Sequence, residues 1–130
     1  MIVVDASVLA PALADDAADG HVARARLRGE VLVAPELIDL EVAAVVRRGV
    51  LSGNVGIRRA ERAVGDLVDL PLQRVSHVRL LGRCWELRES LSIYDAAYVA
   101  LAELLNVVLV TSDARLARAP GVRCVVEVLH

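Results

Sequence analysis

The sequence has no phenylalanine and no lysine, and its only aromatic side chains are one tryptophan and two tyrosines. So few aromatic rings exclude base stacking on an aromatic platform as the main mode of nucleic-acid binding. The absence of lysine excludes a Walker A phosphate loop and the two-component receiver fold, and no GxGxxG segment follows the first apolar run. Backbone contacts would therefore have to dominate any nucleic-acid binding.

Cysteine is also scarce. Cys84 and Cys124 lie far apart, with no CxxC motif and no neighbouring histidine, which fits neither a disulfide framework nor a zinc site. The apolar start is interrupted at Asp5 and has no basic residues before it, so we expect no signal peptide. The longest apolar stretch, residues 96–110, is broken by polar residues and is shorter than the ~20 residues of a membrane span. We therefore expect a cytoplasmic protein with no membrane segment.

Apolar residues, by contrast, are abundant. They make up 56% of the 130 residues, and the mean hydropathy is +0.52. Ordinary soluble domains contain roughly 45–50% apolar residues, so the surplus indicates a protein partner. All fifteen basic residues are arginine, often clustered as at Arg47 and Arg48. Such clusters are either solvated helix faces or phosphate contacts, and the sequence leaves both open.

Short β-branched runs alternate with longer helical patterns, which is typical of a parallel sheet covered by helices. We predict an α/β fold in a single domain, residues 1–130, with a central parallel sheet of about five strands. The expected strands are Ile2–Val4, Val31–Ala34, Leu70–Val75, Val107–Val110 and Arg123–Val126. The expected helices are Ser7–Ala14, Asp19–Arg28, Pro35–Val50, Asn54–Asp66, His77–Ser90, Ile93–Leu105 and a short turn from Asp113.

Several residues mark the expected helix ends. Ser7 and Asn54 are N-cap types, and Pro35 suits a first helical turn. Pro11 lies late enough in its helix to shorten or distort it, because proline removes a backbone donor.

Two aspartates follow buried strands directly. Asp5 ends the run IVVD, and Asp113 follows VVLV after Thr111 and Ser112. Side chains at the carboxyl ends of parallel strands lie where open α/β sheets bind their ligands. Capping of the next helix is the alternative for both residues, because aspartate is a favoured N-cap.

Glu41 lies within a helix whose pattern is strongly apolar. Leu37 and Val45 stand four residues before and after it, so this stripe should face the core. An idle glutamate is not expected there. Glu36 and Asp39 on the same helix compete for the role, and helical spacing alone does not exclude Asp39.

Asp95 begins the almost entirely apolar helix DAAYVALAELL, where N-terminal amides can stabilise its charge. If Ser92, the better capping residue, caps this helix, then Asp95 is free for another role. Clustered carboxylates near a core repel one another until metal ions neutralise them. We therefore predict an acidic metal site made of four residues: Asp5, Glu41, Asp95 and Asp113.

Four segments in order resemble the PIN-domain family, specifically the small VapC-type toxins of bacterial toxin–antitoxin pairs. They are IVVDAS at 2–7, PELIDLEVAAVVRR at 35–48, SIYDAAYVALAELL at 92–105 and VVLVTSDARLARAPGV at 107–122. The resemblance spans the chain and implies a PIN-like fold whose first and fourth strands are adjacent. It also favours Glu41 over Asp39.

By this resemblance, the catalytic and metal-binding residues are Asp5, Glu41, Asp95 and Asp113, with Ser7 and Thr111 as supporting hydroxyls. The implied activity is hydrolysis of RNA phosphodiester bonds with Mg²⁺ or Mn²⁺, cations that prefer carboxylate oxygens. The implied partners are a VapB-like antitoxin, an RNA substrate, with transfer RNA as one candidate, and a second copy in a homodimer.

Three other functions compete with this one. A phosphatase with an aspartyl nucleophile needs a second acid two residues after Asp5, where this chain has Ser7. A DNA nuclease of the flap-endonuclease type uses large insertions that this chain lacks. The remaining alternative is a catalytically inactive PIN-like module that binds protein or RNA.

Overall fold

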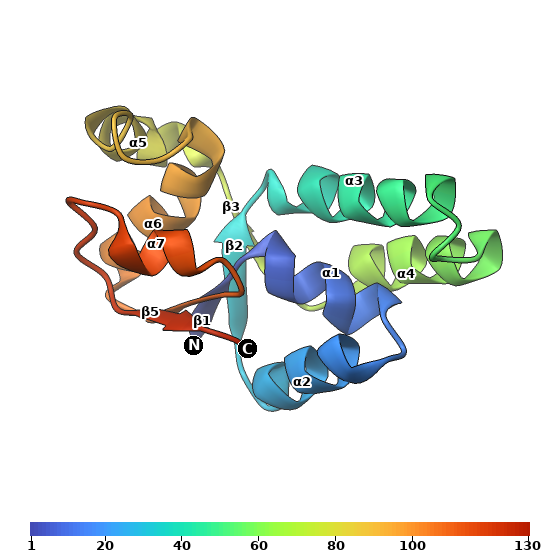
Figure 1. Ribbon diagram of the computed structural model, residues 1–130. Coiled ribbons are helices and arrows are strands. Elements are labelled where there is room, and N and C mark those ends of the chain that lie inside the picture. The colour runs from blue at the N-terminus through green and yellow to red at the C-terminus, as the bar shows by residue number, and fades with distance from the viewer.

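The computed structural model describes residues 1–130 and contains a five-stranded, all-parallel sheet with helices on both sides (Figure 1). The strands are β1 (Ile2–Val4), β2 (Leu32–Pro35), β3 (Gln73–Val75), β4 (Leu109–Thr111) and β5 (Val126–Val128). The helices are α1 (Ala6–Ala14), α2 (Ala18–Leu27), α3 (Ile38–Leu51), α4 (Ile57–Asp69), the 3₁₀ turn η1 (His77–Leu80), α5 (Leu81–Glu86), α6 (Ile93–Leu105) and α7 (Ala114–Arg118). The predicted α/β class is confirmed.

The strand order is β3-β2-β1-β4-β5, which confirms that the first and fourth strands are adjacent. Val3 of β1 lies between Val33 of β2 and Leu109 of β4. The chain builds outward from β1 to β3 and then returns to build β4 and β5. The order therefore reverses between β1 and β4, the place where open α/β sheets bind their ligands.

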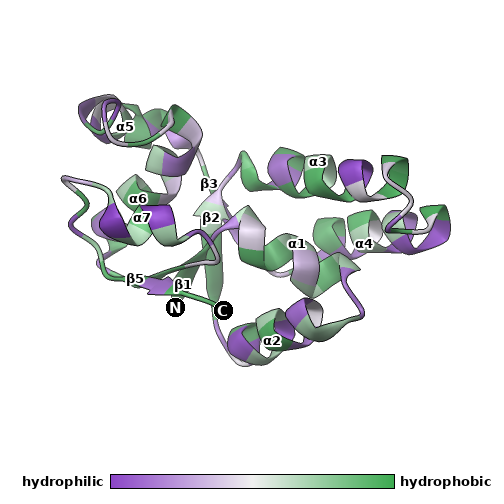
Figure 2. Cartoon of the chain, in the orientation of Figure 1, coloured by the Kyte–Doolittle hydropathy of each residue, from purple (hydrophilic) through white to green (hydrophobic).

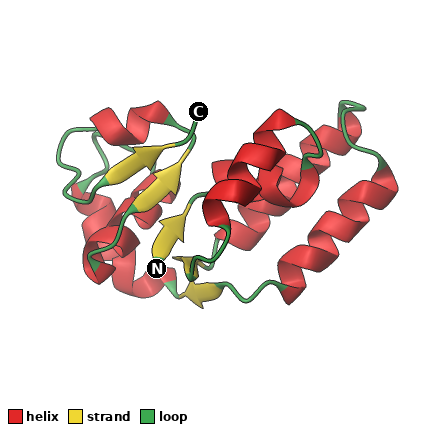
Figure 3. Cartoon of the chain, turned by 90° about the horizontal axis from the view of Figure 1, so that it is seen from below, coloured by secondary structure: helices red, strands yellow, loops and turns green.

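Two helical layers cover this sheet. Helices α1 to α4 lie on one side and α5 to α7 on the other (Figure 1), and the edge of the sheet between them is seen from below in Figure 3. Seven consecutive residues of α6, Ala96–Ala102, are buried. Helix α6 packs against β1, β2 and β4 on one side and against α5 on another. Because it is covered in this way, the middle of its sequence has no polar face. No helix is long and apolar enough to span a bilayer.

The start of α3 differs from the prediction. Pro35 ends β2 instead of opening the helix, and α3 begins at Ile38. The reason is that pairing with β3 continues past the proline, since the Glu36 amide donates to the Val75 carbonyl at 2.9 Å. Similarly, α4 begins at Ile57 rather than near Asn54, whose amide closes the end of α3 on the Gly49 carbonyl.

The region predicted as one helix over His77–Ser90 is divided. The 3₁₀ turn η1, capped by the Ser76 hydroxyl, comes first, and α5 ends at Glu86. Strand β5 lies at Val126–Val128, later than predicted, because the Arg123 amide donates to Glu103 and takes no part in the sheet.

Candidate metal centre

Asp5 lies at the carboxyl end of β1 and is only 7% exposed. Its Oδ2 accepts hydrogen bonds from the Ser7 hydroxyl at 2.8 Å and the Thr111 hydroxyl at 2.7 Å. Its Oδ1 accepts none of the hydrogen bonds in the structure. Hydroxyls from α1 and β4 therefore hold one oxygen of the Asp5 carboxylate, while the other oxygen stays available for a ligand.

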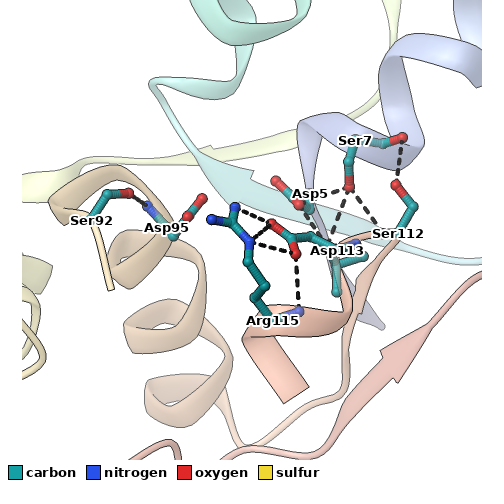
Figure 4. A network of polar contacts seen from close by, with 8 residues as sticks. Asp5, Ser7, Ser92, Asp95, Ser112, Asp113 and Arg115 are labelled. Carbon is teal, nitrogen blue, oxygen red and sulfur yellow. Dashed lines mark hydrogen bonds and ion pairs between the residues drawn. The ribbon is translucent and has the colours of Figure 1, made fainter. Parts of the chain in front are cut away.

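Ser7, Thr111 and Ser112 join the start of α1 to the end of β4. The Ser112 amide donates to the Ser7 Oγ at 3.0 Å, and the Ser112 hydroxyl donates to the Ser7 carbonyl at 3.3 Å (Figure 4). That carbonyl lacks its usual helical partner because Pro11, four residues later, has no N–H. Of the two effects predicted for Pro11, shortening is absent, since α1 runs to Ala14. The Ser7 carbonyl that Pro11 leaves without a helical partner accepts from the Ser112 hydroxyl and so joins α1 to the end of β4.

Glu41 lies in the first turn of α3, and its Oε1 accepts a hydrogen bond from the Tyr98 hydroxyl at 2.5 Å. Burial raises the pKa of Glu41, and the charges of Asp5 and Asp95 raise it further, against the Tyr98 hydrogen bond. Burial likewise raises the pKa of Tyr98, so this phenol stays a donor. The competing residue Asp39 turns elsewhere, since its carboxylate pairs with Arg74 at 2.8 Å.

Asp95 is free of the capping role. Ser92 caps α6 by accepting from the Asp95 amide at 3.1 Å, as predicted (Figure 4). Burial raises the pKa of the Asp95 carboxyl, and the charges of Asp5 and Asp113 add to this rise. The Asp95 carboxylate is therefore a partly buried charge near other carboxylates, without an ion-pair partner of its own.

Asp113 caps α7 by accepting from the Arg115 amide at 3.0 Å. Its carboxylate also binds the Arg115 guanidinium, with Nη2 and Oδ2 2.5 Å apart. This contact holds the pKa of Asp113 below its usual value. The Arg115 side chain reaches from α7 into the space between the Asp113 and Asp95 carboxylates (Figure 4). Both capping and clustering, the two alternatives for Asp113, are thus compatible with its position.

Some of the predicted site residues contact one another in the structure, and others do not. Asp5, Ser7 and Thr111 form one hydrogen-bonded group, and Glu41 and Asp95 are close enough to Asp5 for the charges to shift their pKa values. Asp113 is instead satisfied by Arg115. No three Asp, Glu, His or Cys side chains form a ready-made metal cage. The four carboxylates therefore share a region but do not converge on one point.

The donor set nevertheless suits a hard divalent cation. Asp5 keeps an unbonded oxygen, while the pKa values of Glu41 and Asp95 are raised by burial and by neighbouring negative charge. Arg115 is the only cation that forms an ion pair with any of the four acids. Excess buried negative charge with oxygen donors is the environment in which Mg²⁺ or Mn²⁺ binds. Asp5, Glu41 and Asp95 would be the first residues to hold such an ion.

Sequence reasoning missed the contacts that two residues make in this region. Tyr98 stands three positions after Asp95, one helical turn away, and is one of only two tyrosines. Arg115 stands two positions after Asp113. Their spacing from the acids was a usable signal, but only the fold shows that Tyr98 reaches Glu41, fifty-seven positions earlier.

We expect Asp95→Asn to stabilise the metal-free protein, by an amount that grows as the pH rises from about 4 to 7. Because the folded pKa of Asp95 is raised, the folded state binds more protons than the unfolded chain in this window. Below the unfolded pKa, Asp95 is protonated in both states and costs the folded protein nothing. As the pH rises above that value, the folded protein loses stability because Asp95 must ionise in an unfavourable environment. Urea unfolding should show a difference near zero at pH 3.5 and on the order of 1 kcal/mol at pH 7.

The control for this measurement is Asp66→Asn. Asp66 is exposed on α4 and makes no ion pair or side-chain hydrogen bond. Its replacement should leave the pH profile unchanged. A stability difference between wild type and Asp95→Asn that does not depend on pH would show that ionisation of Asp95 does not destabilise the folded protein.

This chain is similar to known proteins in both sequence and fold. The chain matches the PIN domain family model over residues 2–122. It is 41% identical over 129 residues to ribonuclease VapC1 of Mycobacterium tuberculosis, covering 98% of this chain and 97% of that protein. It is also 41% identical over 129 residues to ribonuclease VapC9 of the same organism, covering 99% and 98%. VapBC2 from Rickettsia felis, solved bound to a promoter DNA fragment, has the same fold, with TM-score 0.70, 14% identity and 100% of both chains covered.

Fold and site together define an α/β protein with an acidic region at the reversal point of a parallel sheet. The chain belongs to the PIN-domain family, among its VapC ribonucleases. The resemblance carried by the four sequence segments is confirmed.

Proposed function

We propose that this VapC-type protein is a Mg²⁺- or Mn²⁺-dependent endoribonuclease toxin that hydrolyses RNA phosphodiester bonds and is neutralised by a VapB-like antitoxin. The observation that carries the metal dependence is the unneutralised negative charge shared by Asp5, Glu41 and Asp95. The ribonuclease activity is supported by the near full-length relatives, which are named as ribonucleases.

Each residue has a defined part in this proposal. Asp5 supplies a rigid ligand, since Ser7 and Thr111 fix one oxygen and leave the other facing the site. Glu41 and Asp95 supply the remaining negative charge from α3 and α6. A bound divalent cation lowers the pKa of water and neutralises charge developing on the phosphodiester. Asp113 completes the set when its carboxylate is released from Arg115.

The surface chemistry supports RNA as the substrate. Folded or single-stranded RNA presents phosphates to arginine, and the exposed Arg47 and Arg48 have no acidic partner. Transfer RNA is the substrate we propose to test first. Cellular RNA is the target, so we place the reaction in the cytoplasm.

The antitoxin is assigned to an apolar groove between α3 and α4. This groove has a volume of ≈ 390 Å³, and Leu51 and Ile57 along it are 69% and 60% exposed. Hydrophilic and hydrophobic segments alternate along both helices (Figure 2). The groove itself is lined by apolar side chains together with the charged Arg47 and Glu61. Such a surface suits an amphipathic segment of a partner protein.

The homodimer is supported by a second set of exposed apolar side chains. Val78, Leu81 and Trp85 in η1 and α5 are 67%, 48% and 62% exposed. Contiguous exposed apolar surface marks protein interaction sites, and these three side chains lie within one short segment of the chain. We propose that this region contributes to the contact between two copies.

The direct test is RNA cleavage with controlled metal. Purified protein should cleave a transfer-RNA pool in Mg²⁺ or Mn²⁺, lose all cleavage in EDTA, and recover it when the divalent ion is restored. A parallel preparation of Asp5→Asn excludes a contaminating nuclease. Cleavage that persists in EDTA contradicts the metal dependence. RNA binding without cleavage in any divalent ion favours the inactive module instead.

A further inference from the structure

Tyr98 is the one aromatic side chain in the core. It is 0% exposed, whereas Trp85 and Tyr94 are 62% and 65% exposed. Its hydroxyl donates to the Glu41 Oε1 at 2.5 Å, and no other side chain is bonded to it. The one side-chain partner of this buried hydroxyl is therefore a carboxylate of the candidate metal centre.

A purely apolar role does not account for the hydroxyl. A phenylalanine ring would fill nearly the same volume, and burying a hydroxyl costs free energy unless it forms a hydrogen bond. The favourable bond here ends on Glu41, from a different helix and fifty-seven positions away. The Tyr98 ring therefore packs in the core, whereas its hydroxyl binds the Glu41 carboxylate.

The position of Tyr98 on α6 links two site residues. Asp95 and Tyr98 are three residues apart, so they lie on neighbouring positions one turn apart along the helix. Asp95 brings its own carboxylate to the site, and Tyr98 reaches the carboxylate brought by α3. One helix thus places two acids, one directly and one through a hydrogen bond.

Glu41 needs such a restraint more than the other acids do. Asp5 has a short side chain held by two hydroxyls, whereas glutamate has an additional rotatable bond and loses more freedom when it is ordered. No other side chain donates a hydrogen bond to Glu41. Without the phenol, its carboxylate would sample several rotamers.

We propose that Tyr98 is a positioning residue that fixes the Glu41 carboxylate for divalent-metal binding. This inference rests on the proposed metal-dependent function and adds the residue that aims one of its acids. Partners that orient metal-binding side chains typically contribute about 10- to 100-fold to metal affinity or activity.

The test is Mn²⁺ binding by calorimetry to the full-length protein, with no RNA present. Tyr98→Phe should bind Mn²⁺ about 10-fold more weakly than wild type. The matched control is Tyr94→Phe, which removes an exposed hydroxyl from the same helix and should leave Mn²⁺ affinity unchanged. Circular dichroism and thermal unfolding of the metal-free proteins verify that both variants fold.

A second background separates positioning from general packing. In Glu41→Gln, the further change Tyr98→Phe should alter Mn²⁺ affinity less than about twofold, because the carboxylate being aimed is already gone. Equal weakening in both backgrounds would overturn the proposal. So would a Tyr98→Phe variant that unfolds at lower temperature yet binds Mn²⁺ as tightly as wild type.

The two proposals fail in different ways. If the wild-type protein binds no Mn²⁺, the proposed metal-dependent function is wrong and this inference is overturned with it. If wild type and Tyr98→Phe bind Mn²⁺ equally, only the role of Tyr98 is overturned. Weaker Mn²⁺ binding by Tyr98→Phe alone, absent in the Glu41→Gln background, supports both.

Discussion

Asp5→Asn should reduce metal-dependent RNA cleavage by on the order of 10³- to 10⁴-fold while leaving the fold intact. The asparagine oxygen can take the place of Oδ2 and accept from both the Ser7 and Thr111 hydroxyls. The amide nitrogen then replaces Oδ1, the oxygen that is free in the structure. The substitution therefore removes the charge and the ligand oxygen without removing the hydrogen bonds that hold this side chain.

The same variant should raise the stability of the metal-free protein. The negative charge of Asp5 raises the pKa values of both Glu41 and Asp95, so removing that charge relieves their repulsion. We expect a gain on the order of 1 kcal/mol at pH 7, or a few degrees in Tm. Added Mg²⁺ or Mn²⁺ should then raise the Tm of wild type more than that of the variant.

The control is again Asp66→Asn, which replaces an exposed aspartate of α4 with no partner. It should retain full cleavage and an unchanged Tm. Undiminished cleavage by Asp5→Asn would remove Asp5 from the catalytic residues. A variant that loses cleavage but also unfolds would instead assign Asp5 a role in folding.

Local patterns predicted the parts of the fold that depend on near neighbours. The run IVV gives β1 because β-branched residues suit a strand buried on both faces, and Ser92 caps α6 as its type suggests. Errors arose where a distant group takes a backbone donor or acceptor. Strand β5 is displaced because Glu103 binds the Arg123 amide, and α3 starts late because Val75 binds the Glu36 amide.

The candidate site was predictable to the same degree. Asp5 was marked by its place at a strand end, a property of one short segment. The strand order that brings β4 beside β1 came from the family resemblance and could not be derived from the pattern. The Tyr98–Glu41 hydrogen bond and the Asp113–Arg115 pair depend on side-chain directions, which sequence spacing alone does not fix.

Glu103→Gln should destabilise the protein by about 2 kcal/mol, because it removes the charge from a partly buried, hydrogen-bonded ion pair. The Glu103 side chain on α6 is 13% exposed and binds Arg83 of α5, which is 19% exposed, with Nε and Oε1 2.7 Å apart. Its other oxygen accepts from the Arg123 amide at 2.8 Å. Arg83 also donates to the Gly121 carbonyl at 2.6 Å, so this pair joins α5, α6 and the segment before β5.

The pH dependence gives this prediction a second signature. Burial acts to raise the pKa of Glu103, but the hydrogen bonds from Arg83 and Arg123 outweigh it and hold the pKa below its usual value. A carboxyl with a lowered folded pKa contributes stability above its unfolded pKa and loses it as the pH falls. The difference between wild type and Glu103→Gln should therefore be full at pH 7 and shrink below about pH 4.

The matched control is Glu86→Gln, which removes the other acid that pairs with Arg83. Glu86 is 61% exposed and its oxygen lies 3.7 Å from the guanidinium, so its loss should change stability by less than about 0.5 kcal/mol. Urea unfolding of the three proteins at pH 7 and pH 3.5 measures both differences. Equal effects of the two substitutions would show that the Arg83–Glu103 pair stabilises the protein no more than an exposed ion pair does. Other contacts would then hold the segment before β5. A loss confined to Glu103→Gln would instead identify this partly buried pair as the contact that holds the segment before β5 against α6, the helix that carries Asp95 and Tyr98.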